Sequence, residues 1–84
     1  MTLPTTTRIL IFFARNPREW LRGPELEDKF EMEPGSSSGA LMHYRRKGYL
    51  AGERDPNDSR TMVYRIGPVL LREIGGGAVD GDTP

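Results

Sequence analysis

The sequence predicts one α+β domain, mostly helical, with three helices, a short strand, a two-stranded hairpin and a short C-terminal helix. Apolar residues recur at helical spacing through the first half, and apolar and polar residues alternate over residues 61–66. A cluster of turn-forming residues precedes that alternation. The 84 residues suffice for one domain, which we place in residues 1–74. We expect residues 75–84, rich in glycine and aspartate, to be a disordered tail.

The first helix is predicted over residues 5–15. Its apolar side chains cover a wide arc and are expected in the core: Ile9, Leu10, Phe12 and Phe13. Asn16-Pro17 ends it, because proline holds the preceding residue extended. A short extended stretch follows, in which we expect Trp20 to close one end of the core, with a binding role as the alternative.

The second helix is predicted to begin at Gly23-Pro24, since proline is tolerated in a first turn. Leu26 and Phe30 lie one turn apart and should face inward. The acidic side chains around them are expected to face outward: Glu25, Glu27, Asp28 and Glu31.

The third helix, or its approach, begins at Pro34. Serine and glycine over residues 36–39 suit a helix N-terminus better than a helix interior. The expected inner face consists of Ala40, Leu41 and Tyr44. Gly48 should end the helix after three cations that favour its negative end.

The hairpin is predicted from strands at residues 49–54 and 61–66, joined by a loop at residues 55–59. An apolar segment, residues 69–74, should end at the glycines 75–77. Three helices with a tight turn between the last two, followed by a two-stranded wing, define a winged helix-turn-helix.

Charge is segregated along the chain although the net charge is zero. Residues 23–35 contain five acids and one lysine, whereas residues 36–66 contain six cations and three acids. The folded domain could therefore present an acidic face and a basic face. Without cysteine the chain forms neither disulfides nor thiolate zinc sites. The longest apolar run, residues 9–14, is too short for a membrane span or secretion signal, so we expect a cytoplasmic protein.

Two stretches share a pattern with a known family. Residues 25–26 are Glu-Leu, Pro34 precedes the third helix, and residues 44–50 are Tyr-Arg-Arg-Lys-Gly-Tyr-Leu. Residues 54–60 are Arg-Asp-Pro-Asn-Asp-Ser-Arg. This order resembles the helix-turn-helix and wing of MarR-type transcriptional regulators, over roughly residues 8–74.

The resemblance implies that the third helix enters the major groove of DNA. It also implies that Arg60 approaches the neighbouring minor groove or its phosphates, while Asp58 helps to fix the wing. Three features depart from the family: the long terminal helices that form its dimer have almost no counterpart, residues 35–39 are small, and Gly52-Glu53 replaces a basic pair.

We therefore expect sequence-specific binding of double-stranded DNA and transcriptional regulation, with no cofactor. Serine hydroxyls and arginines are suited to phosphates, and Met42 and His43 to bases or sugars. The expected contact residues are Ser36, Ser37, Ser38, Met42, His43, Arg45, Arg46, Arg54 and Arg60. One module buries about 600–1,000 Å² on DNA, so we expect a homodimer, tandem sites or a second regulatory protein.

The alternative is a winged helix that binds protein without DNA, which the zero net charge and the acidic second helix favour. Arg45 and Arg46 could merely complement the helix dipole, Arg60 could pair with Asp58, Met42 could meet a protein, and His43 could have no function. A shared arginine face without acids favours DNA. Glu53 and Asp55 on that face would favour a protein partner.

An enzyme is not expected. Residues 35–39, Gly-Ser-Ser-Ser-Gly, match the nucleophile elbow of hydrolases, which needs a preceding strand and then an acid and a histidine later in the chain. The only histidine, His43, stands six residues after Ser37 and ahead of every later acid.

Overall fold

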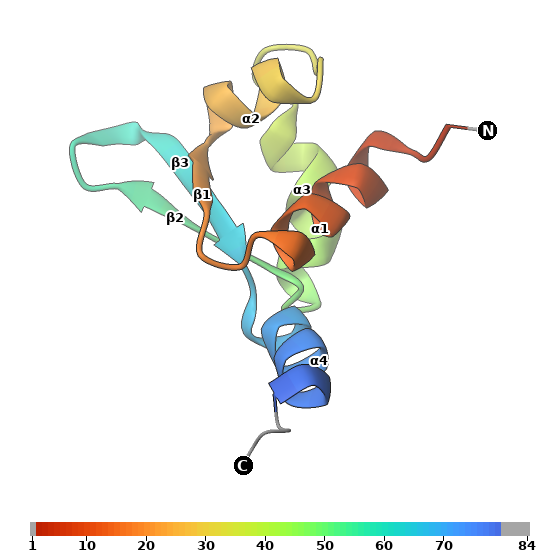
Figure 1. Ribbon diagram of the computed structural model, residues 1–84. Helices are drawn as coiled ribbons and strands as arrows, with labels where there is room; N and C mark the ends of the chain where they lie inside the picture. Colours follow the sequence, from red (N-terminus) through yellow and green to blue (C-terminus); the bar gives the residue numbers. More distant parts are fainter. Residues whose placement is uncertain (1, 80–84) are drawn as a thin grey trace.

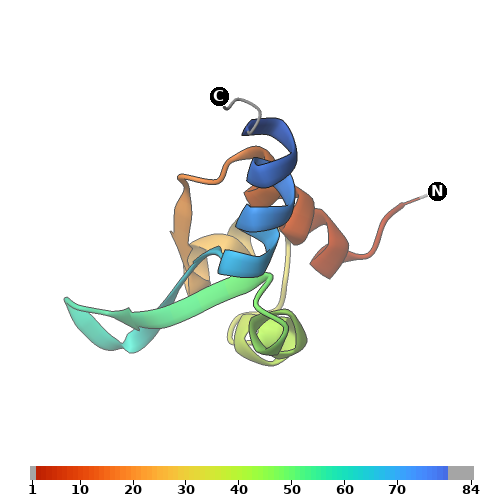
Figure 2. The same ribbon diagram turned by 90° about the horizontal axis from the view of Figure 1, so that it is seen from below.

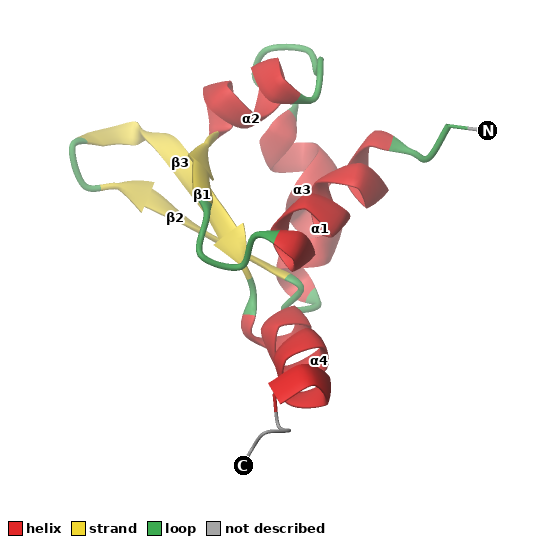
Figure 3. Cartoon of the chain, viewed as in Figure 1, coloured by secondary structure: helices red, strands yellow, loops and turns green. Residues whose placement is uncertain are grey.

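The computed structural model describes residues 2–79, which form four helices and three strands (Figures 1 and 3). In chain order these are α1 (Thr5–Arg15), β1 (Trp20–Arg22), α2 (Gly23–Lys29), α3 (Ser37–Arg46), β2 (Leu50–Asp55), β3 (Asp58–Ile66) and α4 (Pro68–Val79). The predicted α+β winged architecture is confirmed.

The three strands form one antiparallel sheet in the order β1-β3-β2. Tyr64 and Ile66 of β3, with Leu50 of β2, turn toward the helices. The core that they form with the helices consists of Ile9, Phe13, Leu26, Phe30, Leu41, Leu50, Tyr64 and Ile66. The β2–β3 hairpin extends beyond this core as the wing (Figure 1).

Helix α1 has the predicted bounds because its apolar residues return every turn. Ile9 and Phe13 are fully buried, and the Phe12 ring meets the rings of Phe13 and Phe30 edge-on at centroid distances of 5.1 and 5.9 Å. At the C-terminus the side-chain amide of Asn16 donates to the Phe12 carbonyl at 2.9 Å, so a polar side chain satisfies one of the last carbonyls.

Gly48 ends α3, as predicted. Its φ is +80°, a conformation that side chains disfavour, and its N–H donates to the Arg45 carbonyl at 3.2 Å. A β-carbon at this position would lie 2.7 Å from Cγ2 of Val69. Both the backbone angle and the close approach of α4 therefore require glycine here.

The expectation that Trp20 closes the core is wrong. Trp20 pairs with Arg65 in the sheet and lies 51% exposed on the face turned away from the helices. Its ring lies 5.3 Å from the Arg22 guanidinium. The next residue, Leu21, packs against the core instead, since successive side chains of a strand point to opposite faces.

Two helix-face predictions are also wrong. Glu27 is predicted to face outward but is buried, because it bonds to the start of α3. Ala40 is predicted on the inner face of α3 but is exposed, while Leu41 is buried and Tyr44 packs against the core.

The hairpin is longer and its loop shorter than predicted. β2 continues to Asp55 and β3 starts at Asp58, which leaves Pro56-Asn57 as the loop in place of residues 55–59. A register irregularity between Arg54 and Asp55 accommodates this turn. Turn-forming residues thus occupy the last paired positions as well as the loop.

Helix α4 continues past Ile74, the predicted end of the apolar segment, and through the glycines 75–77 to Val79. Residues 80–84 of the expected tail lie outside the described residues, and the domain boundary at residue 74 remains a prediction. No helix within residues 2–79 is long and apolar enough to cross a membrane.

Candidate nucleic-acid interface

Helix α3 and the wing lie on the same side of the molecule. Figure 2 shows α3 end-on with the β2–β3 hairpin reaching out beside it, whereas α1 and α4 lie toward the other side. The two elements that carry the candidate contact residues are therefore neighbours in space.

The start of α3 is held by a buried carboxylate. Oε2 of Glu27 accepts hydrogen bonds from Ser37 N–H at 3.1 Å and from Ser37 Oγ at 2.7 Å. Burial alone would raise the pKa of Glu27, but the bonds from the Ser37 hydroxyl and from the N–H groups of Gly35 and Ser37 outweigh it and lower the pKa. The negative charge also lies at the positive end of the α3 dipole.

The three serines predicted as contacts therefore differ. Ser37 is only 4% exposed and gives both of its donors to Glu27, so we assign it to positioning α3. The Ser36 hydroxyl donates to the Glu33 carbonyl at 2.7 Å. Ser38 is exposed and, among these serines, is the one best placed to reach a ligand.

The outward face of α3 carries the other predicted contacts. Met42 is 44% exposed, and His43 is exposed beside it. Arg46 is exposed, whereas Arg45 is half-buried and its side chain lies against β2. α2 is the element that precedes this helix, so Ser37 does not have the strand-to-helix setting of a hydrolase elbow.

A hollow of about 640 Å³ separates α3 from the wing. We call it the inner wing hollow. Arg45 from α3 and Arg54 and Arg60 from the wing line it together with Ser38. The other lining residues are Gly23, Pro24, Glu27, Pro34, Gly35, Ser37, Thr61, Met62 and Tyr64. The one acid among them, Glu27, is the buried carboxylate bonded to Ser37.

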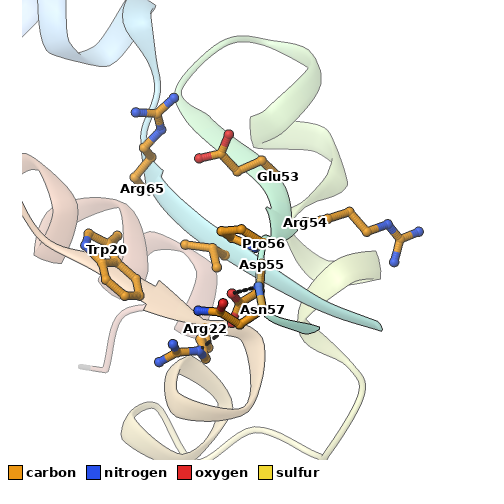
Figure 4. A pocket seen from close by; sticks show the side chains of 9 residues that line it. Trp20, Arg22, Glu53, Arg54, Asp55, Pro56, Asn57 and Arg65 are labelled. Carbon is orange, nitrogen blue, oxygen red and sulfur yellow. Dashed lines mark hydrogen bonds and ion pairs between the residues drawn. The ribbon is translucent and has the colours of Figure 1, made fainter. Parts of the chain in front are cut away.

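Two of the three acids of the wing face the other way, whereas Asp58 lies beside Arg60 at the tip. Glu53 and Asp55 line a second hollow, which we call the outer wing hollow, on the opposite face of the sheet with Trp20, Arg22 and Arg65. Arg54 borders both hollows. Figure 4 shows Glu53 and Arg65 extending from the hairpin on one side, while the Arg54 side chain points away from them. Within residues 2–79 no carboxylate lies within 4.0 Å of a charged nitrogen of Arg45, Arg46 or Arg54.

The wing tip is braced by Asp58, as the family resemblance implied. Its carboxylate accepts hydrogen bonds from Arg60 N–H at 3.1 Å and from Thr61 Oγ1 at 2.8 Å. The Arg60 guanidinium lies 4.0 Å from Asp58, yet the Arg60 side chain is 94% exposed. Arg54 donates to the Ser59 carbonyl at 2.8 Å. Hydrogen bonds thus hold the backbone of the tip, while the Arg60 side chain extends into solvent.

Sequence reasoning missed a second brace, between β1 and the wing. Arg22 Nε donates to Asp55 Oδ2 at 2.7 Å, and Asn57 N–H donates to Asp55 Oδ1 at 2.9 Å (Figure 4). The Asn57 bond, then Arg22, lowers the pKa of Asp55. The sequence gives no signal for this pairing, because Arg22 and Asp55 are 33 residues apart.

Solved structures share this fold. Lactococcus lactis ZitR (C30AH42A mutant) matches with a TM-score of 0.66 and 18% identity over 93% of this chain and 52% of its own. Heme-free PefR matches with a TM-score of 0.70 and 9% identity, over 90% and 66%. Streptococcus pyogenes AdcR matches with a TM-score of 0.66 and 16% identity, over 95% and 56%. No family model and no curated protein matches.

Another structure of ZitR is described as that of a zinc-responsive MarR family member. The fold is a MarR-like winged helix. This winged helix spans only 52–66% of the three chains above. Among residues 2–79 of this chain, no three histidine, cysteine, aspartate or glutamate side chains are grouped as a metal site.

Proposed function

We propose that this winged helix binds double-stranded DNA and regulates transcription. Helix α3 would enter the major groove, and the wing would meet the adjacent minor groove or its phosphates. The observation that supports this most strongly is the sorting of charge across the wing. Arg45, Arg54 and Arg60 line the inner wing hollow, whereas Glu53 and Asp55 line only the outer one, which Arg54 also borders.

Chemically, the proposed interface divides into two kinds of contact. Arg45, Arg46, Arg54 and Arg60 would neutralise phosphates, which supplies most of the affinity and makes it salt-dependent. Ser38, Met42 and His43 would approach bases or sugars from the exposed face of α3. Ser36 and Ser37 would act through the conformation of the helix start.

We further propose that two copies, or one copy and a second protein, occupy a site together. A single module offers about 600–1,000 Å² to DNA, which gives weak binding at physiological salt. Leu71 of α4 is 46% exposed, whereas Leu70 and Ile74 pack against the core. Among the side chains described over residues 68–75 of α4, Leu71 is therefore the apolar one best placed for a partner. The cytoplasmic location expected from the sequence remains a prediction.

The test is a salt series of binding to a random-sequence duplex. We expect affinity to fall steeply with salt. Arg45→Ala/Arg46→Ala and Arg60→Ala should flatten the dependence by about one unit of slope for each phosphate that is no longer neutralised. Arg65→Ala is the matched control for Arg60→Ala, because it also removes one charge, from an exposed position on the outer face of the wing. Absence of native binding at low salt, or equal slopes for all variants, would favour a protein-binding module.

A further inference from the structure

Gly52 lies where the side chain of Arg45 meets the wing. Gly52 pairs with Tyr64 in the sheet. A β-carbon added to it would lie 2.9 Å from Nε of Arg45 and 3.2 Å from Cζ. At 2.9 Å the Arg45 side chain would have to move, so it occupies the space that a β-carbon at position 52 would fill.

Arg45 lies at the junction of two hollows. It lines the inner wing hollow and also a third hollow between α3, β2 and the start of α4. The other residues of this third hollow are Met42, Arg46, Leu50, Ala51, Gly52 and Pro68. No carboxylate within residues 2–79 lies within 4.0 Å of its charged nitrogens. Packing against the β2 backbone, with no ion pair, therefore sets the direction of this cation.

The backbone at Gly52 does not itself require glycine. Its φ is outside the left-handed region, unlike that of Gly48. Glycine weakens a strand, because it adds conformational freedom to the unfolded chain and has no side chain to pack. The atoms that alanine would displace are the far end of Arg45 and Cε of Met62, at 3.2 Å, and both belong to flexible side chains.

We propose that Gly52 is a positioning residue for DNA binding, which lets the Arg45 guanidinium lie across β2 and reach a phosphate between α3 and the wing. This inference rests on the proposed function and identifies the residue that directs the Arg45 guanidinium. It assigns to Gly52 a role in ligand affinity and none in the stability of the fold.

The experiment compares the native chain with Gly52→Ala, Arg45→Ala and the double variant. Binding to a random duplex is measured by fluorescence anisotropy across a salt series, with a thermal melt of each variant. We expect Gly52→Ala to melt at or above the native temperature and to lose about five- to tenfold in affinity at 0.1 M salt, the electrostatic effect of one phosphate contact. The double variant should bind like Arg45→Ala.

A second readout needs no DNA. The Arg45 Nε–Hε resonance of the free protein should shift in Gly52→Ala, because the guanidinium has moved. Gly75→Ala is the matched control, since a β-carbon at Gly75 meets no atom within 4 Å and the residue lies in α4. It should leave both affinity and the Arg45 resonance unchanged.

The outcomes separate the two proposals. If native protein binds and Arg45→Ala is weakened while Gly52→Ala binds like native, the positioning role is wrong and the proposed function stands. Additive losses in the double variant overturn it equally, because independent effects mean that Gly52 does not act through Arg45. If native protein does not bind DNA at low salt, the proposed function itself fails.

Discussion

The two faces of the wing are built from the same two strands but carry different charged side chains. On the inner face, Arg54 and Arg60 extend toward a hollow shared with Arg45. On the outer face, Asp55 is bonded to Arg22 and Asn57. Alternation along β2 is enough to place Glu53 and Arg54 on opposite faces. A zero net charge thus says little about whether one face can bind a polyanion.

Charge reversal should give the largest difference between the two faces of the wing. Arg54→Glu/Arg60→Glu should lower affinity for duplex DNA by at least about 50-fold at 0.1 M salt, because two cations proposed to neutralise phosphates are replaced by acids. Arg65→Glu, on the outer face, should cost less than about threefold. Anisotropy titrations of the three proteins check this. The double variant changes the net charge by four units and Arg65→Glu by two, so a decrease in log affinity only twice as large would show that total charge alone matters.

The buried acid of the inner hollow gives the next largest effect. Glu27→Ala should lower the free energy of unfolding by about 2–3 kcal/mol, because it removes two hydrogen bonds to a carboxylate and leaves the Ser37 donors unsatisfied. Urea denaturation measures the decrease. Asp28→Ala, at an exposed position of the same helix, is the control. Matching midpoints for the two variants would show that the Glu27 hydrogen bonds contribute nothing specific.

Lowering the pH tests the comparison further, because each hollow is lined by one carboxylate with a lowered pKa: Glu27 in the inner hollow and Asp55 in the outer one. The pKa of Glu27 lies below its ordinary 4.5 and that of Asp55 below its ordinary 3.8. The stability that each provides is present above the ordinary value and is lost as pH falls through the lowered one. We expect the urea midpoint to decline below about pH 4.5 and the decline to be shallower in Glu27→Gln. A midpoint that is flat from about pH 5 to about pH 3 would contradict this.

The smallest effect concerns Tyr64. Its ring fills the core, while its buried hydroxyl has no hydrogen-bond partner among the described residues. Tyr64→Phe should leave stability unchanged or raise it by up to about 1 kcal/mol, because it removes an unsatisfied polar group and keeps the ring. A thermal melt is sufficient. A clear decrease in stability would mean that the hydroxyl has a partner in solution.

The parts predicted correctly are those that local patterns determine. The turn-by-turn return of Ile9 and Phe13 locates α1, and Gly48 locates the end of α3. The period-two alternation near Tyr64 locates β3. The turn cluster predicts a longer loop than the structure has, because the same residues also suit the ends of a tight hairpin.

The errors at Trp20 and Glu27 share one cause, which is a partner distant in sequence. Trp20 faces outward because β1 pairs with the middle of β3, where its partner is Arg65. Glu27 is buried because it meets Ser37, ten residues on. For the candidate site, the run of serines marks the right helix end. It cannot show which hydroxyl is already bonded within the protein.

The braces at Asp55 and Asp58 have a consequence for the energetics of association. A loop that becomes ordered when it binds a ligand loses conformational entropy during binding, and this loss reduces the affinity. Here the tip is already held by bonds to Arg22, Asn57 and Thr61 before any partner arrives. The wing tip therefore needs little further ordering when it binds its target. Its contribution to binding should appear mainly as released counterions, with a small heat-capacity change.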